Sequence, residues 1–94
     1  MKYDYLKRIV YMPKNHYIKD RIVKLGKTEN MFFATMWFSR GHKATYKELY
    51  KRVYGNGSVE KPLLRNIAMI LRRKKIPIKT VYKYGYKLQE EKKK

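Results

Sequence analysis

Residues 62–88 read PLLRNIAMILRRKKIPIKTVYKYGYKL, and this stretch decides how the rest of the chain is interpreted. At 3.6-residue spacing one side of a helix in its first half would carry Leu63, Leu64, Ile67, Ile70 and Leu71. At about 100° per residue the other side would carry Arg65, Asn66, Met69, Arg72 and Arg73. The pattern predicts a helix over residues 62–75, closed by Pro77, with a basic free face suited to the major groove of DNA. The alternative is a solvated basic face on an ordinary helix.

A β-hairpin is predicted directly after this helix, over residues 78–88. Successive side chains over 78–83 would alternate between the two faces of a strand, and Gly85 offers a permissive turn position. A basic hairpin behind a basic helix is typical of a winged helix-turn-helix. In that fold the helix enters one groove, and the wing, here tipped by Tyr82, Lys83 and Tyr84, reaches the adjacent backbone or minor groove. The alternative is an ordinary closing hairpin.

Composition bounds the rest of the interpretation. Ninety-four residues make one small domain, 1–88, followed by a charged tail, 89–94. The chain has no cysteine, no apolar run long enough to cross a bilayer, and charges where a signal peptide would be apolar, so we expect a cytoplasmic protein. The net charge of +18 favours a polyanion, of which nucleic acid is the commonest. An anionic membrane surface would need an exposed apolar helix face, and the core needs every apolar stripe, so we expect no membrane partner.

The N-terminal part, residues 1–25, predicts about three short antiparallel strands. We expect a strand over 5–12, a turn over 13–15, and strands at 17–18 and 22–25 separated by a turn over 19–21. A first helix over 26–40 follows, with Gly26 as its N-cap, Glu29 at the third position and Gly41 placed to end it. Its aromatic side predicts core packing and consists of Phe32, Phe33, Met36 and Trp37.

A second helix over 45–54 is predicted by the capping box that Thr45 and Glu48 form, after a short extended link at 43–44. Its apolar side would be Tyr46, Leu49, Tyr50 and Val53, and a loop over 55–61 leads to the basic helix. Two helices, a short loop and a basic helix form a helix-turn-helix-like unit. Thr45, Tyr46 and Lys47 are well placed to hold a DNA phosphate on free N–H groups at the start of the second helix.

Several motifs resemble the OmpR/PhoB-type DNA-binding domain. Residues 78–88, IKTVYKYGYKL, are similar to its wing, which commonly reads IRTVRGVGYRL. Residues 25–29, LGKTE, are similar to its LTPTE, and Leu71-Arg72-Arg73-Lys74 to its LRKK. Glu48-Leu49 through Val53-Tyr54-Gly55 resembles its second helix, and the motifs follow in the family's order from residue 22 to residue 88.

The resemblance implies an α+β fold, a winged helix-turn-helix with a short N-terminal antiparallel sheet, three helices and a C-terminal β-hairpin wing. It implies sequence-specific binding of double-stranded DNA, often by head-to-tail homodimers on direct repeats, and regulation of transcription. It also places a possible RNA polymerase contact in the Gly55–Lys61 loop. We expect no receiver domain, because the residues ahead of Leu25 are too few to form one. The chain departs from the family in having Gly26-Lys27 in place of Thr-Pro and a larger wing tip.

No catalytic pattern is visible, so we expect a protein that is not an enzyme and needs no cofactor or metal. His16 and His42 fall in predicted loops without carboxylate or cysteine partners and are interpreted as surface residues. Three functions stay open. The favoured one is a stand-alone winged-helix regulator, with a viral or mobile-element origin as a guess. The others are a non-specific architectural DNA- or RNA-binding protein, and a winged-helix module that binds the transcription machinery.

Overall fold

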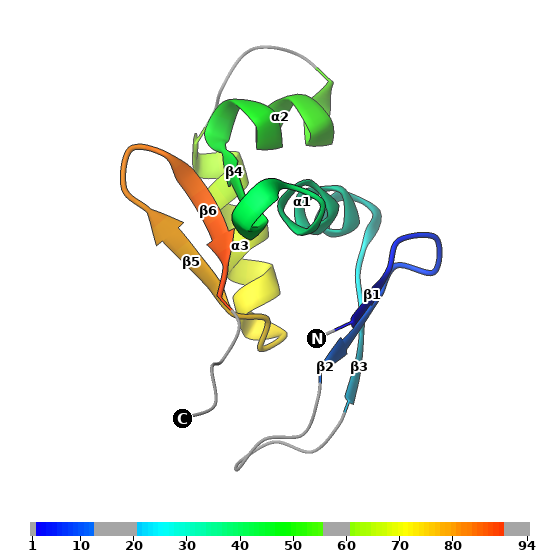
Figure 1. Ribbon diagram of the computed structural model, residues 1–94. Helices are drawn as coiled ribbons and strands as arrows, with labels where there is room; N and C mark the ends of the chain where they lie inside the picture. Colours follow the sequence, from blue (N-terminus) through cyan, green and yellow to red (C-terminus); the bar gives the residue numbers. More distant parts are fainter. Residues whose placement is uncertain (1, 13–20, 56–60, 90–94) are drawn as a thin grey trace, which may run out of the picture.

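A computed structural model describes residues 2–12, 21–55 and 61–89. Within them the chain forms a small α+β domain with three α-helices and two three-stranded antiparallel sheets (Figure 1). The order is β1 (Lys2–Asp4), β2 (Ile9–Met12), β3 (Arg21–Lys24), α1 (Lys27–Trp37), a 3-10 turn η1 (Arg40–His42), β4 (Lys43–Thr45), α2 (Tyr46–Tyr54), α3 (Lys61–Arg73), β5 (Ile78–Val81) and β6 (Gly85–Leu88). This arrangement is compatible with a winged-helix-like fold.

The N-terminal sheet has the strand order β1-β2-β3, with Val10 of β2 opposite both Tyr3 and Val23. The expected single strand over 5–12 is wrong, because Tyr5–Arg8 form a turn between β1 and β2. In that turn the Lys7 amide donates to Asp4 Oδ1 at 3.0 Å, and Arg8 has a left-handed φ of 55°. The expected turn at 13–15, the strand at 17–18 and the start of the turn at 19–21 lie outside the described residues, and Arg21 belongs to β3.

Helix α1 begins as expected, since the Gly26 amide donates to Glu29 Oε1 at 3.2 Å. Phe32, Phe33 and Met36 are fully buried, which confirms the predicted core side. The helix ends at Trp37 and not at residue 40. His42, expected at the surface, is half-buried, and its ring stacks on Trp37 at 4.9 Å between centroids.

Helices α2 and α3 follow the predicted ranges within a residue or two. Helix α2 ends at Gly55, whose φ of 79° is the left-handed geometry that glycine accepts without strain. Helix α3 ends at Arg73, ahead of the predicted residue 75. Lys75 has a left-handed φ of 66°, and the Ile76 amide donates to the Leu71 carbonyl. These two features cap the C-terminal end of the helix.

The C-terminal sheet has the order β4-β6-β5, with Ala44 opposite Tyr86 and Ile78 opposite Leu88. The expected extended link at 43–44 is therefore a strand. Gly85 allows this pairing, since a Cβ on it would lie 1.9 Å from the Ala44 carbonyl oxygen. The assignment of Gly85 to the turn is wrong: it lies in β6, and Lys83, with a φ of 58°, is the left-handed residue of the turn.

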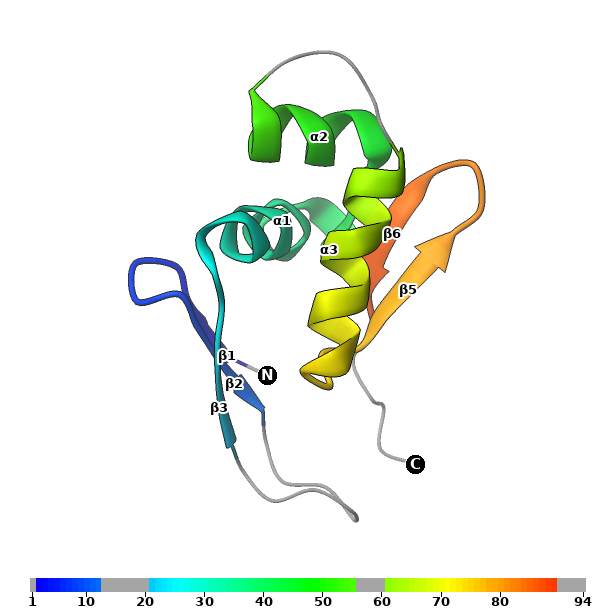
Figure 2. The same cartoon turned by 180° about the vertical axis from the view of Figure 1, so that it is seen from behind.

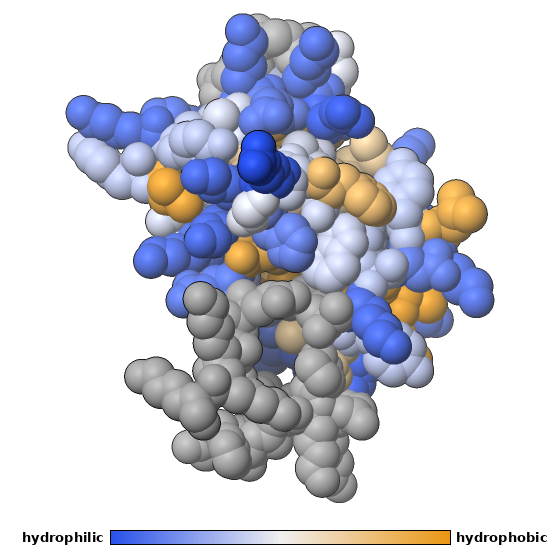
Figure 3. Space-filling view, viewed as in Figure 1, coloured by the Kyte–Doolittle hydropathy of each residue, from blue (hydrophilic) through white to orange (hydrophobic). Residues whose placement is uncertain are grey.

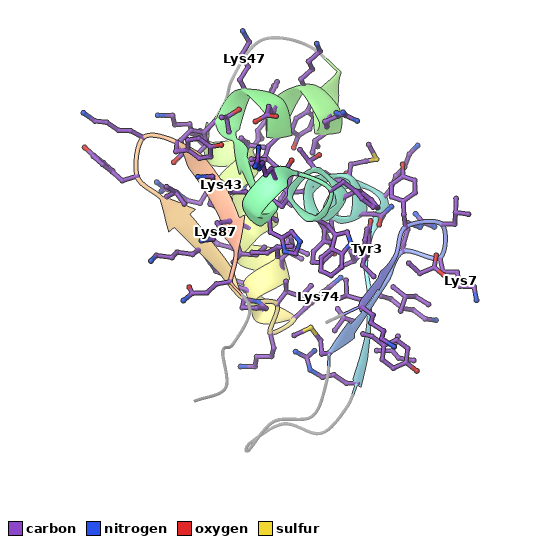
Figure 4. The ribbon with its side chains drawn as sticks, viewed as in Figure 1. Tyr3, Lys7, Lys43, Lys47, Lys74 and Lys87 are labelled. Carbon is purple, nitrogen blue, oxygen red and sulfur yellow. The ribbon has the colours of Figure 1, made fainter. Side chains whose placement is uncertain are left out.

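One core joins both sheets to the helices, with Val10 and Val23 from one sheet and Ala44, Tyr86 and Leu88 from the other. Polar contacts attach the N-terminal sheet to the C-terminal end of α3. Arg21 Nη1 donates to the Lys74 carbonyl at 2.6 Å, and Lys74 Nζ contacts the Lys24 carbonyl at 2.9 Å and Glu29 Oε1 at 2.5 Å (Figure 4). The end of α3 is thus tied to β3 and to the start of α1 by residues 45 to 53 positions away in the chain.

Candidate nucleic-acid interface

The outward side of α3 is basic. Leu64, Ile67, Ala68 and Leu71 are buried against the rest of the domain. All five residues predicted for the free face are exposed, namely Arg65, Asn66, Met69, Arg72 and Arg73. The prediction that Ile70 packs in the core is wrong, because it is 38% exposed and Met69 beside it is 41% exposed. The small Ala68 is buried instead, and the outward side of α3, which faces the viewer in Figure 2, carries cations and the two apolar side chains of Met69 and Ile70.

Arg72 differs from the other arginines of α3 because it is already hydrogen-bonded within the domain. Its Nε donates to the Ile78 carbonyl at 2.9 Å, and its Nη2 donates to Thr80 Oγ1, also at 2.9 Å. Both acceptors are in β5, so one guanidinium ties α3 to the hairpin that follows it. Arg72, predicted as a DNA-contacting residue, is exposed, and two of its donors are already used within the domain. Its geometry fits a residue that sets the angle between α3 and the β5–β6 hairpin.

The turn of the hairpin presents aromatic rings and a cation. Tyr82 is 84% exposed, and the Lys83 ammonium lies 5.4 Å from the centre of its ring. Tyr84 is half-buried, and the Lys43 ammonium lies 5.2 Å from the Tyr84 ring. Cation–π contacts of this kind hold the charge close to a flat apolar surface without neutralising it. The predicted tip is thus partly confirmed in its exposure, with Tyr82 and Lys83 outward and Tyr84 turned toward β4.

The start of α2 is occupied by the protein's own groups. The Tyr46 amide donates to the Tyr84 carbonyl at 3.0 Å, the Glu48 amide to Thr45 Oγ1 at 3.1 Å, and the Thr45 amide to Glu48 Oε1 at 3.1 Å. The expectation of free N–H groups here is wrong for these three amides, because the capping box and the hairpin turn satisfy them. The Lys47 side chain is exposed at this end of α2 (Figure 4).

Tyr86 links the electrostatics of α3 to the C-terminal sheet. Burial raises the pKa of its hydroxyl above the ordinary value, and nearby Tyr46 raises it further. Arg72 and Arg65 act in the opposite direction, because positive charge stabilises a phenolate. The two arginines therefore oppose part of the rise that burial causes in the pKa of Tyr86.

A row of lysines on the C-terminal sheet was missed by the sequence reasoning. Lys43 of β4 is opposite Lys87 of β6, and Lys87 is opposite Lys79 of β5, all three exposed. We call these three residues the lysine row. Lys79 and Lys87 could have been paired from the hairpin alone, but Lys43 could not, because β4 was expected to be an unpaired link.

The space-filling view shows where hydrophobic side chains reach the surface. In Figure 3 hydrophilic residues cover most of the region over the C-terminal sheet and α2, and orange gathers at the right, over the N-terminal sheet and its β1–β2 turn. Leu6 in that turn is 89% exposed. Over the described part of the chain, every helix is too short or too polar to cross a membrane.

Comparison of this chain with protein-family models, with curated proteins and with solved structures gave no match. The resemblance to the OmpR/PhoB-type domain therefore stays a prediction from the motifs.

Proposed function

We propose that this protein is a sequence-specific, double-stranded-DNA-binding regulator of transcription with a winged helix-turn-helix of the OmpR/PhoB type. The observation that carries the proposal is the coupling of an exposed basic helix, α3, to an exposed basic hairpin through Arg72. Hydrogen bonds from Arg72 and the shared core join the two elements, and in this proposal they contact one duplex together. The net charge of +18 supplies the long-range attraction.

In this proposal α3 is the recognition helix and lies in the major groove. Arg65 and Arg73 are suited to the O6 and N7 atoms of guanine, Asn66 to the N6 and N7 atoms of adenine, and Met69 to a thymine methyl group. Ile70, exposed beside Met69, adds a second apolar contact for the same purpose. Arg72 serves as a positioning residue, because two of its donors are already used within the domain.

The β5–β6 hairpin is the wing in this proposal. Tyr82 and Lys83 would contact the adjacent backbone or minor groove, with Tyr84 supporting the turn from the β4 side. Phosphate contacts would come from exposed lysines around this surface, including Lys47, Lys61 and Lys83. Lys61, at the first turn of α3, lies over the Tyr46 ring at 4.9 Å, which places its charge between α2 and α3.

Two alternatives from the sequence remain as competitors. A non-specific architectural protein is favoured by the exposed lysines outside the α3 surface, the lysine row among them. A module that binds RNA polymerase would use the Gly55–Lys61 loop, of which residues 56–60 lie outside the described part of the chain. The first predicts equal affinity for all duplexes, and the second predicts DNA binding too weak to matter at physiological salt.

Selection of preferred sites from random duplex DNA at physiological salt tests the proposal. We expect an enriched motif, and, if head-to-tail dimers form, two copies of it as a direct repeat. The variant R65A/N66A/R73A should lose the preference for the motif, since each base-contacting side chain contributes about 1–3 kcal/mol of discrimination. The variant K2Q/K7Q/K27Q, altered on exposed lysines outside this surface, should keep it. No enrichment with the native chain would overturn the proposal.

A further inference from the structure

The lysine row lies on the outer face of the C-terminal sheet, and we propose that it binds the phosphate backbone of a second DNA duplex. The protein would then bridge two DNA segments, one on α3 and one on this face. The inference rests on the proposed duplex binding by α3 and goes beyond it in assigning a second, separate binding surface.

The register of the sheet builds the row. Lys43, Lys87 and Lys79 are consecutive cross-strand partners, so their side chains leave the same face of three neighbouring strands. With about 4.8 Å between strands, the row spans about 10 Å. Like charges placed directly opposite each other destabilise a sheet. The sheet contains two such pairs in one line, and a bound polyanion would relieve the repulsion.

Carboxylates in the described residues are engaged elsewhere and do not neutralise the row. Asp4 accepts from the Lys7 amide, Glu29 contacts Lys74, and Glu48 caps α2. Glu90 and Glu91, next along the chain, lie outside the described residues. The lysine row lines a shallow hollow together with His42 and Val81, so a chain of phosphates would lie against the sheet in this hollow.

The row lies on the opposite side of the sheet from α3. Helix α3 is behind this sheet in Figure 1 and in front of it in Figure 2, whereas Figure 4 places Lys43 and Lys87 over the side away from α3. The alternation of the strands agrees, because Ala44, Tyr86 and Ile78 point to the core and their neighbours in the row point outward. Duplex DNA is stiff over about 150 base pairs. A short duplex seated on α3 therefore does not reach the row, and a second segment does.

Nucleic acid fits this face better than an acidic protein segment does. Protein partners are held mainly by aromatic or aliphatic anchors in buried pockets. The lysine row instead presents ammonium groups. An ammonium group acts as a point charge and can bind a phosphate at any position along a DNA backbone. The face is thus suited to a regular anionic polymer whose sequence is not read.

The test compares two variants that remove the same charge, K43Q/K79Q/K87Q on the row and K2Q/K7Q/K27Q on the N-terminal part. Fluorescence anisotropy measures binding to one short duplex, and bridging is measured as capture of a fluorescent duplex by protein loaded on a bead-tethered duplex. We expect both variants to bind the single duplex alike. The row variant should lose bridging about tenfold or more, with a salt slope for capture of the second duplex smaller by about 3.

The outcomes separate the inference from the proposed function. If the native protein binds one duplex but captures no second one, the inference is wrong and the proposed function stands; binding to no duplex at all would remove both. Bridging that survives in the row variant would show that bridging comes from another surface or from protein dimers, and would overturn the inference. Capture of polyglutamate, but of no second duplex, by the loaded native protein would assign the row to an acidic protein and overturn it as well. Circular dichroism of both variants confirms that they are folded.

Discussion

Arg72 is the residue on which the geometry of the proposed DNA surface depends. Arg72→Ala removes two hydrogen bonds to β5 and should lower the free energy of unfolding by about 1–2 kcal/mol, measured by urea denaturation. Because the hairpin loses its attachment to α3, affinity should fall for all duplexes by a similar factor. Arg72→Lys should not restore it, since one ammonium does not reproduce the two-point contact. A loss confined to the preferred site would show instead that Arg72 contacts a base.

A substitution at Gly85 tests whether β4 and β6 need their close approach. Gly85→Ala places a methyl group against the Ala44 carbonyl and should destabilise the domain by about 3 kcal/mol or more. Gly55→Ala is the control, because Gly55 has a left-handed φ but open space around it, so its cost should be about 1 kcal/mol. Equal losses in the two variants would contradict the role assigned to Gly85.

At the scale of single elements, the start of α2 distinguishes a structural cap from a phosphate site. Thr45→Ala removes the acceptor of the Glu48 amide and should cost about 1 kcal/mol of stability. Since the Tyr46 amide is already bonded to Tyr84, the affinity of the folded variant for DNA should be nearly unchanged. The two quantities are measured by thermal unfolding and by anisotropy below the unfolding transition. A large loss of affinity without a loss of stability would restore the phosphate-site interpretation.

The elements that the sequence predicted well are those with a local signal. Helix α3 and the hairpin followed from periods of 3.6 and 2, and the cap of α2 from Thr45 and Glu48 at the right spacing. Strand β4 was missed because its partner Tyr86 is 42 positions beyond Ala44, and three residues carry no period of their own. The same distance hid the lysine row and the bonded state of Arg72, since neither the β4 pairing nor the side-chain hydrogen bonds of Arg72 are visible in a linear pattern.

For the whole molecule, stability should fall at alkaline pH. Burial raises the pKa of the Tyr3 and Tyr86 hydroxyls above the ordinary tyrosine value, so the folded state favours their neutral forms. Their contribution is complete below pH 10 and is lost as the pH rises beyond it. The free energy of unfolding, measured by urea denaturation, should decline less steeply in Tyr86→Phe than in the native protein between about pH 9 and pH 11. This range is centred on the ordinary tyrosine pKa of about 10. An unchanged slope would contradict this origin.

The affinity for DNA should also depend on the salt concentration, through the charge of the whole molecule. With about six phosphate contacts, log K for a duplex should fall with log salt at a slope near −5. Titration by anisotropy between about 50 and 200 mM salt measures the slope. Removing Lys47, as Lys47→Gln, should reduce it by about 1 if that ammonium contacts a phosphate. A flat response would count against every DNA-binding role proposed for this chain.

The attachment of the N-terminal sheet to the end of α3 has a consequence for the order of folding. Its two contacts join residues separated by 50 and 53 positions, so they close the longest loops among the side-chain hydrogen bonds described. The entropy of closing such a loop is lost before the contact forms, whereas helices and hairpins need only near neighbours. We therefore expect the β5–β6 hairpin and the three helices to acquire their shape early in refolding. The docking of β1–β3 onto Lys74 would then be the late, rate-limiting event.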